Sequence, residues 1–404
     1  MKKVLIISYF FPPRPTIGSQ RAYKLAKYFP EFGWEPIVLT AKLQGNPPQN
    51  VRIIETEYRD ILKEMKSKLG FNKEIGIHEQ MGIPVKSKNF NHPTLRSKII
   101  KLFKEIIAFP DENKGWYEFA VKTASEFLFN EKVDVMISTS SPVTSHLIAK
   151  KLKQKYKIPW IADLRDLWTQ NHFYNKFALI KNIEKRLELK TLSRADILVT
   201  VTNRFAESLK SLHKDKKVFC ITNGYDTDDF QKIPTKLTNN FTITYTGELY
   251  NGKRAPYLLF EAVAQLLSEN KINRDLIEIR FLGHEEDWLI DMVKKYKLEG
   301  IVNYYGFISR KEALEKQKES QLLLLLLDRN NKEEDVYPAK VFEYFGARRP
   351  IIAIGGDRGI IKDLLEITNA GKFASSTNIL KNALLQYYQE VIESGAVKCD
   401  SNSN

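Results

Sequence analysis

The most regular feature of the sequence is a series of short, largely apolar runs, most of them followed by a helical pattern or a turn. They are Val4–Tyr9, Pro36–Thr40, Val135–Ser138, Trp160–Ala162, Ile197–Val201, Val218–Ile221, Phe241–Tyr245, Ile277–Leu282, Leu322–Leu327 and Ile351–Ile354. Strands that are apolar on both faces and alternate with helices are typical of parallel sheets covered on both sides. The pattern therefore predicts an α/β protein.

These runs exceed what one sheet comfortably holds, so we expect two doubly wound, Rossmann-like domains that face each other across a cleft. We place the first domain at 1–203 and the second at 204–378, with the polar stretch Ile233–Asn240 as an alternative boundary. Residues 379–404 are expected to form a helix that can pack back on the first domain, followed by a polar tail. The stretch 42–94 lacks clear periodicity and is interpreted as an irregular insertion.

Composition narrows the class of protein. The 404 residues are 43% hydrophobic and 28% charged, which excludes a disordered chain and a disulfide-stapled mini-protein. Two distant cysteines, Cys220 and Cys399, support neither a disulfide framework nor a four-ligand zinc site, and they fit a reducing, cytoplasmic compartment. Leu322–Leu327, the longest apolar run, is far shorter than the roughly 18 residues of a spanning helix. The N-terminus is interpreted as a buried strand, not a signal peptide.

The charge balance implies an acidic partner. Lys and Arg number 63 against 49 Asp and Glu, a net charge of +14. Residues 86–109 form a basic amphipathic segment, in which Ile99, Phe103 and Ile106 are spaced as on one helix face. Its acid-free part contains Lys86, Lys88, Arg96, Lys98, Lys101 and Lys104. An ordinary surface helix and a helix that binds an anionic membrane both fit this pattern.

The first candidate site residues follow predicted strands of the first half, where ligands of parallel sheets bind. Gly18 opens a helix after the first strand, so its backbone can approach a phosphate or a sugar hydroxyl, although a plain turn also uses glycine. Asp163, Arg165 and Asp166 follow a buried strand, and they either form a structural ion pair or face a polar ligand. We favour the ligand and name them catalytic candidates. His146, on a helix, is a weaker candidate.

The second half has two further clusters. Gly247 follows a strand, and Lys253 and Arg254 come shortly after it, where they can neutralise a diphosphate. Lys340 and Glu343 lie on a helix that begins near Pro338. Lys340 suits a phosphate, and the carboxylate of Glu343 can accept hydrogen bonds from a ribose diol. The alternative for the first cluster is a solvated loop, and the alternative for the second is a solvated acidic loop that caps a core helix. We see no cluster of metal ligands.

Six stretches, in this order, resemble those of the retaining nucleotide-sugar glycosyltransferases with the GT-B fold, family four. They are the Phe10–Arg21 loop, Ala195–Thr202, Ile221–Phe230, Tyr245–Arg254, Gly306–Arg310 and Asp335–Glu343. The resemblance covers nearly the whole chain, and one departure points to a subgroup that assembles bacterial surface polysaccharides: Arg165-Asp166 stands where many members have His-Asp.

The resemblance implies a donor held mainly by the second domain and an acceptor held by the first. It assigns the diphosphate to Lys253 and Arg254, the ribose to Glu343, and a catalytic place near the donor sugar to Asp335. Gly18 would touch the donor phosphate or the acceptor. Three other positions depart from the family pattern: Ser19 replaces a glycine, Asp335 a glutamate, and Glu248 an arginine.

We therefore expect a cytoplasmic, membrane-peripheral glycosyltransferase that moves a sugar from a nucleotide-diphosphate sugar to a lipid-linked saccharide in surface-polysaccharide synthesis. It would need no metal and no cofactor besides its donor, and would not bind nucleic acid. One alternative is a nucleotide-sugar 2-epimerase of the same fold. The other is a basic nucleic-acid-binding protein, which predicts a basic stripe interleaved with stacking aromatics instead of one acid-free segment.

Overall fold

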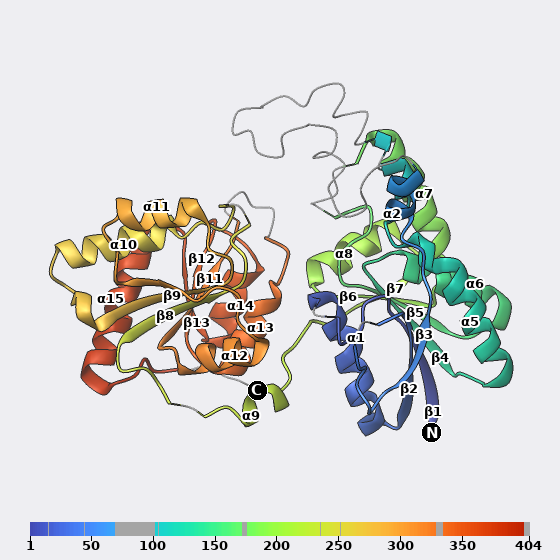
Figure 1. Cartoon of the computed structure of the whole chain (residues 1–404), viewed down its shortest axis with the longest axis horizontal. Coiled ribbons are helices and arrows are strands. Elements are labelled where there is room, and N and C mark those ends of the chain that lie inside the picture. The colour runs from blue at the N-terminus through green and yellow to red at the C-terminus, as the bar shows by residue number, and fades with distance from the viewer. Residues whose placement is uncertain are drawn as a thin grey trace. The chain divides into compact units, whose positions relative to one another are not determined.

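The computed structural model describes the chain except residues 15, 44, 69–101, 104, 172–175, 235, 251, 329–333 and 400–404. The chain divides into two compact units, Met1–Thr222 and Asn223–Asn404, here called the first and the second unit (Figure 1). Each contains one parallel sheet, with helices along its connections. The predicted α/β class with two Rossmann-like domains is confirmed.

The sheet of the first unit has the strand order β3-β2-β1-β4-β5-β6-β7. Its strands are β1 (Lys2–Ile7), β2 (Trp34–Ala41), β3 (Arg52–Thr56), β4 (Val135–Ser140), β5 (Trp160–Leu164), β6 (Ile197–Thr200) and β7 (Lys217–Cys220). Its helices are α1 (Ile17–Tyr28), α2 (Ile61–Lys68), α5 (Tyr117–Asn130), α6 (Thr144–Tyr156), α7 (Ala178–Leu192) and α8 (Asn203–Leu212), with 3₁₀ turns at Phe29–Phe32 and Lys114–Trp116.

The sheet of the second unit has the order β10-β9-β8-β11-β12-β13. Its strands are β8 (Phe241–Thr246), β9 (Ile277–Leu282), β10 (Val302–Tyr304), β11 (Leu322–Leu326), β12 (Ile351–Ile354) and β13 (Gly371–Ala374). Its helices are α9 (Asp228–Gln231), α10 (Tyr257–Ser268), α11 (Asp287–Lys295), α12 (Arg310–Glu319), α13 (Ala339–Ala347), α14 (Ile360–Thr368) and α15 (Thr377–Ser394), with a 3₁₀ turn at Arg274–Leu276.

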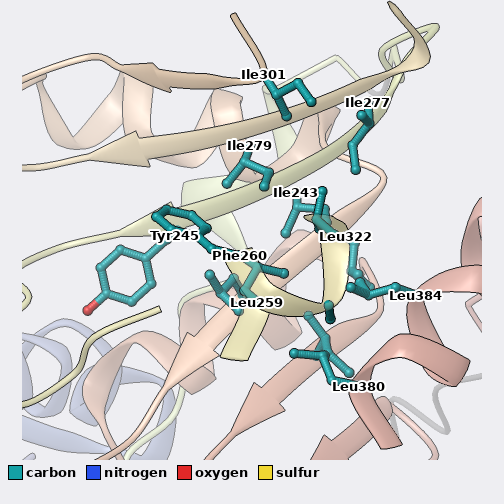
Figure 2. Close-up of a cluster of buried hydrophobic side chains, with 14 of the residues drawn as sticks. Ile243, Tyr245, Leu259, Phe260, Ile277, Ile279, Ile301, Leu322, Leu380 and Leu384 are labelled. Atoms are coloured by element: carbon teal, nitrogen blue, oxygen red, sulfur yellow. The ribbon is translucent and has the colours of Figure 1, made fainter. Parts of the chain in front are cut away.

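The core of the second unit explains why its central strands are so apolar. Every residue of β11 is buried, because helices cover both faces of the sheet. Figure 2 shows Ile243 and Leu322, from neighbouring strands, packed with Leu259 of α10 and Leu380 of α15. The carboxyl ends of strands held in this way are fixed in position, and the loops that follow them can therefore place ligand-binding groups accurately.

Two expectations about domain organisation were wrong. The division falls after Thr222, not at 203, because β7 pairs with β6 and completes the first sheet. The C-terminal helix α15 packs on α10 in the core of the second unit, so it belongs to that unit and is not a separate segment.

The stretch 42–94 is not wholly irregular either, since it contains β3 and α2. Most of the basic segment near 86–109, including Lys98, Lys101 and Lys104, lies outside the described residues, whereas 102–103 and 105–107 are helical. Within the described part of the chain, no helix has the length and hydropathy needed to cross a membrane.

Candidate functional site

The ends of β8 and β9 lie so close together that both need glycine. Gly247 has a φ of +107° and its backbone N–H donates to the carbonyl of Leu282 at 2.8 Å. A Cβ at Gly283 would lie 2.6 Å from the carbonyl oxygen of Gly247. A Cβ at Gly247 would itself lie 3.2 Å from Nζ of Lys340. The glycines therefore leave room for a lysine at the carboxyl edge of the sheet.

Lys340 projects from the first turn of α13 to this edge. Its Nζ lies 3.9 Å from the centroid of the Tyr245 ring, a close cation–π contact. The hydroxyl of Tyr245 donates to the carbonyl of Glu248 at 2.7 Å, and burial raises the pKa of Tyr245, so the phenol stays neutral. The ring thus supports a cation beside the Gly247 loop without adding a negative charge there.

Tyr344, on the same helix, fixes α13 against the sheet. Its hydroxyl donates to the carbonyl of Leu324 at 3.0 Å and accepts from the backbone N–H of Thr246 at 3.2 Å. Burial raises the pKa of Tyr344 to about 12. The helix that carries Lys340 and Glu343 is therefore tied to the end of β8 and to the middle of β11.

Glu343, one turn after Lys340, is held by an arginine that we did not predict as a site residue. Nη2 of Arg310 lies 3.3 Å from a carboxylate oxygen of Glu343 and 3.0 Å from one of Asp229. The side chains of Glu343 and Arg310 are 34% and 46% exposed. The carboxylate is thus oriented by a cation and still accessible to a ligand.

Lys253 lies at a cavity of about 190 Å³. The cavity opens at the carboxyl ends of β11 and β12 and the N-terminus of α10. Its lining consists of Gly252, Lys253, Ala255, Tyr257, Leu258, Leu326, Leu327, Asp328 and Ile354. A lysine and a helix N-terminus at one opening favour an anion. The neighbouring Arg254 instead stacks over the ring of Tyr250, 4.6 Å from its centroid.

Asp335 lies in a turn before α13, beside the start of α14. The carbonyl of the preceding Glu334 accepts from the backbone N–H of Ile360 at 2.9 Å. Residues 329–333, which lead into this turn, lie outside the described part of the chain. Asp335 is half-buried.

In the first unit, Asp163 belongs to a buried ion pair, the alternative that we had not favoured. Its side chain is 3% exposed. Nε and Nη2 of Arg21 donate to its carboxylate at 3.0 to 3.1 Å, and the hydroxyl of Thr139 donates to it at 2.8 Å. Arg21 also donates to the carbonyls of Ile221 and Thr222. Both oxygens of Asp163 are therefore engaged within the protein.

Arg165 binds backbone carbonyls. Its Nε donates to Ser140 at 2.7 Å, Nη1 to Gly18 at 2.5 Å and Nη2 to Ser141 at 2.9 Å. Burial lowers the pKa of this guanidinium. A Cβ at Gly18 would lie 3.1 Å from Nη1, so this glycine makes room for the arginine. Arg165 thus joins the first turn of α1 to the end of β4 and the residue that follows it.

Asp166 differs from its two neighbours in the predicted cluster. Its side chain is exposed, and it has no hydrogen-bond or ion-pair partner among the described residues. Of the two aspartates in the cluster predicted around the end of β5, Asp166 is therefore the one whose carboxylate is accessible to a ligand.

His146 is a core histidine. It is fully buried, and its Nδ1 lies 2.7 Å from Oγ of Ser138, which also accepts from Nε1 of Trp160 at 2.8 Å. Burial lowers the pKa of His146 to about 4, so the ring is neutral at pH 7. In the described residues, no three His, Cys, Asp or Glu side chains gather as a metal site would require.

Comparisons with known proteins identify the fold. Residues 86–229 match the family model described as Glycosyltransferase Family 4. No curated protein matches the sequence significantly. Sucrose-phosphate synthase from Thermosynechococcus elongatus has a TM-score of 0.60 at 14% identity, over 98% of this chain and 90% of that one. Anabaena HepE, in complex with UDP and glucose, has a TM-score of 0.57 at 14% identity over 98% and 92%. WaaG, a glycosyltransferase involved in lipopolysaccharide biosynthesis, has 0.53 at 13% over 96% and 90%.

The chain has the GT-B fold. In this GT-B chain the sequence reasoning missed two arginines, Arg21 and Arg310, although each ends a stretch that we had compared with the family. A signal was present for the first: a buried carboxylate such as Asp163 requires a cation. For Arg310 there was none, since Glu343 and Asp229 are exposed enough to need no partner.

Proposed function

We propose that this protein is a glycosyltransferase that uses a nucleotide-diphosphate sugar and transfers the sugar, with retention, to a lipid-linked saccharide of a surface polysaccharide. The arrangement of Lys340 and Glu343 on one face of α13, beside the Gly247 loop, carries the proposal. The GT-B fold supports it, as do the family match at 86–229 and the UDP and glucose bound by HepE. The role of WaaG in lipopolysaccharide biosynthesis supports the class of acceptor.

The donor half of the reaction needs cations. The bond between the anomeric carbon and the phosphate oxygen breaks, and its electron pair leaves with the diphosphate. Lys253, at the cavity beside the N-terminus of α10, and Lys340, beside Gly247, are the groups we assign to this charge. Two cations can stabilise the charge of the departing diphosphate without a metal ion. Arg254 and Asp335 are assigned secondary roles, on the diphosphate and near the donor sugar.

Glu343 is assigned to the ribose. Its carboxylate can accept from two vicinal hydroxyls, and Arg310, at 3.3 Å, orients it. In the first unit we assign Asp166 to the acceptor. The acceptor's hydroxyl oxygen forms the new bond to the anomeric carbon, and its proton passes to the departing diphosphate. The contacts of Asp163, Arg165 and Gly18 give them a positioning role around Asp166.

The test begins with a panel of UDP-, GDP- and dTDP-sugars in a thermal-shift assay, because a ligand that binds the folded state raises the melting temperature. With the best donor, Glu343→Gln is expected to lower kcat/KM roughly 100-fold, since two hydrogen bonds to a charged group are worth about 1.5 kcal/mol each. The melting temperature without ligand should not change. Glu366→Gln, an exposed glutamate of the same unit, is the matched control.

Several outcomes would contradict the proposal. Normal turnover in Glu343→Gln would remove the ribose assignment. Loss of activity in EDTA, restored by a divalent ion, would show that the two lysines do not suffice. An epimerised donor formed without any acceptor would identify a 2-epimerase instead.

A further inference from the structure

An arginine lies beside two tyrosine rings at the carboxyl edge of the first sheet. Cζ of Arg14 is 5.2 Å from the centroid of the Tyr9 ring and 5.5 Å from that of the Tyr58 ring. The two rings meet at an interplanar angle of 78°. Because each ring attracts the guanidinium electrostatically, the pair fixes where the cation lies. We call Arg14, Tyr9 and Tyr58 the Arg14 site.

Three neighbouring strands position this site. Tyr9 follows β1, Tyr58 follows β3, and Nη2 of Arg14 donates at 2.7 Å to the carbonyl of Lys42, the residue after β2. β1, β2 and β3 are adjacent and parallel, so their carboxyl ends meet at one edge of the sheet. Ligands of open α/β sheets bind at this edge.

The ring of Tyr9 is itself held by a buried network. Tyr9 is 4% exposed, and its ring packs against that of Trp116 with centroids 5.4 Å apart. Nε1 of Trp116 donates to the hydroxyl of Thr56 at 2.7 Å, and the hydroxyl of Thr40 donates to the carbonyl of Tyr9 at 3.2 Å. Since Arg14 rests on a fixed ring, it loses little conformational freedom when it binds a ligand.

The charge of Arg14 has no carboxylate partner in the described part of the chain. The two glutamates at the end of β3 have other partners: Glu57 pairs with Nζ of Lys42 at 2.8 Å, and Glu55 accepts from the backbone N–H of Leu43 at 3.2 Å. A guanidinium has several N–H donors, and Arg14 uses one of them for the Lys42 carbonyl. The other N–H groups suffice for a two-point hydrogen bond to a carboxylate or a phosphate.

Two other arginines of the first unit show the contrast. Arg21 pairs with the buried Asp163 at 3.0 Å, and Arg165 donates to three backbone carbonyls. Both side chains therefore serve the scaffold. Arg14, which is half-buried, combines a fixed position with N–H groups that are still available.

We propose that Arg14 selects acceptors that carry an anionic group, a carboxylate or a phosphate, and binds that group with its guanidinium. Asp166, assigned to the reacting hydroxyl, follows β5, which is three strand positions from β2. Three positions correspond to about 14 Å. The anionic group therefore belongs to a part of the acceptor away from the hydroxyl that reacts. This inference rests on the proposed function, because it requires an acceptor in the first unit.

An anionic group has two sources in a lipid-linked saccharide. One is a uronic acid among its sugars, and the other is the diphosphate that joins the saccharide to the lipid. Both offer two oxygens to one guanidinium. The diphosphate of the donor is a different group, which we have assigned to Lys253 and Lys340 of the second unit.

The experiment is isothermal titration calorimetry of the full chain, without donor, with two pairs of probes. The first pair is a disaccharide that ends in glucuronic acid and the same disaccharide ending in glucose. The second is N-acetylglucosamine joined to an octyl chain through a diphosphate, and its octyl glycoside without the diphosphate. We expect the charged member of one pair to bind roughly tenfold or more tightly than the neutral member, and that pair identifies the source.

Two variants test the site itself. Arg14→Gln should remove the preference for the charged probe, because it removes the cation. Tyr58→Leu should reduce this preference, because the guanidinium then lies beside one ring instead of two. The affinity for the neutral probe should stay the same in both variants.

The matched control is Arg52→Gln. Arg52 begins β3 at the opposite edge of the sheet, and its Cζ also lies beside an aromatic ring, 5.3 Å from the centroid of Phe127. This variant should keep the full preference for the charged probe.

Three results would overturn the proposal: no tighter binding of the charged member in either pair, a preference that persists in Arg14→Gln, or an equal loss in Arg52→Gln. The thermal shift caused by the donor should be the same in Arg14→Gln as in the unmodified protein. Failure of acceptor selection and failure of the proposed donor site are therefore separate results.

Discussion

The interactions of Asp163 show how a buried charge is accommodated in the first unit. Burial of an unpaired carboxylate costs several kcal/mol, and this cost is offset only by good geometry and full hydrogen bonding. Arg21 and Thr139 supply that geometry. Because Arg21 also binds the carbonyls of Ile221 and Thr222, the same side chain connects α1, β5 and the end of the unit. Asp163 therefore serves the scaffold around the exposed Asp166.

His146 gives a pH dependence of stability whose sign is set by its low pKa. Its pKa is about 4 in the folded protein against an ordinary value of 6.5, so between these limits the unfolded chain binds the proton more readily. The stabilisation is fully present above pH 6.5 and is lost as the pH falls toward 4, by roughly 3 kcal/mol. His146→Asn, which cannot titrate, is expected to lack this slope in urea unfolding.

Glu184 is the necessary control for this measurement, because its contribution to stability changes with pH in the opposite direction. Burial and neighbouring carboxylates raise its pKa to about 7 from 4.5, so its contribution is present below pH 4.5 and is lost as the pH rises through 7. Glu184→Gln removes that effect and should steepen the fall of stability between pH 6.5 and 4. A difference between the unmodified protein and His146→Asn that stays constant over this range contradicts the assignment.

Single residues were predictable from the sequence where the chemistry is local. Lys340 and Glu343 are three positions apart on a helix that begins just after Pro338, so their common face follows from helix geometry alone. The partners of Asp163 and Glu343 were not predictable, because they depend on which elements become neighbours. Arg21 is 142 positions from Asp163, and Arg310 is 33 from Glu343.

At the level of elements, the ten predicted strands are all present, and the three that the prediction missed are edge strands. β3 is at one end of the first sheet, and β10 and β13 are the two ends of the second. Edge strands are covered less completely, and only one residue of β10, Val302, is buried. A search for apolar runs detects strands that are buried on both faces, so it favours the middle of a sheet.

Close packing of α13 on α9 can be tested at Gly346. A Cβ there would lie 2.2 Å from the ring of Phe230. We expect Gly346→Ala to lower the free energy of unfolding by roughly 1 to 3 kcal/mol, because overpacking outweighs the better helix propensity of alanine. Urea unfolding measures the change.

A double-mutant cycle identifies the cause. In a Phe230→Leu background, Gly346→Ala should cost clearly less, since the clashing ring is gone. Gly224→Ala, where a Cβ meets nothing within 4 Å, is the control and should be close to neutral. Additive effects of the two substitutions would mean that the clash with Phe230 is not the reason for the glycine.

At the scale of the whole molecule, the C-terminal segment of the second unit is bound to the core of that same unit. Nε of the buried Arg349 donates to the carbonyl of Ser320 at 2.8 Å, and its Nη2 donates to those of Gln321 and Val397 at 3.1 and 3.2 Å. With α15 packed on α10, these bonds return the end of the chain to the sheet on which the donor-site loops are built. The second unit thus has a hydrophobic core of its own, and its C-terminal segment packs within that unit.

Because the second unit has its own core, the donor residues assigned to it can be tested apart from Gly18. Gly247, Lys253, Lys340 and Glu343 all lie within residues 223–404, whereas Gly18 lies in the first unit. If the four suffice, a fragment 223–404 should bind the nucleotide that stabilises the full chain, and at about 100 times its Kd should gain about 2.7 kcal/mol. Calorimetry of the fragment, with circular dichroism to confirm folding, measures this gain. A folded fragment that does not bind would show that the donor needs groups of the first unit. Gly18→Ala in the full chain would then test whether the first turn of α1 supplies them.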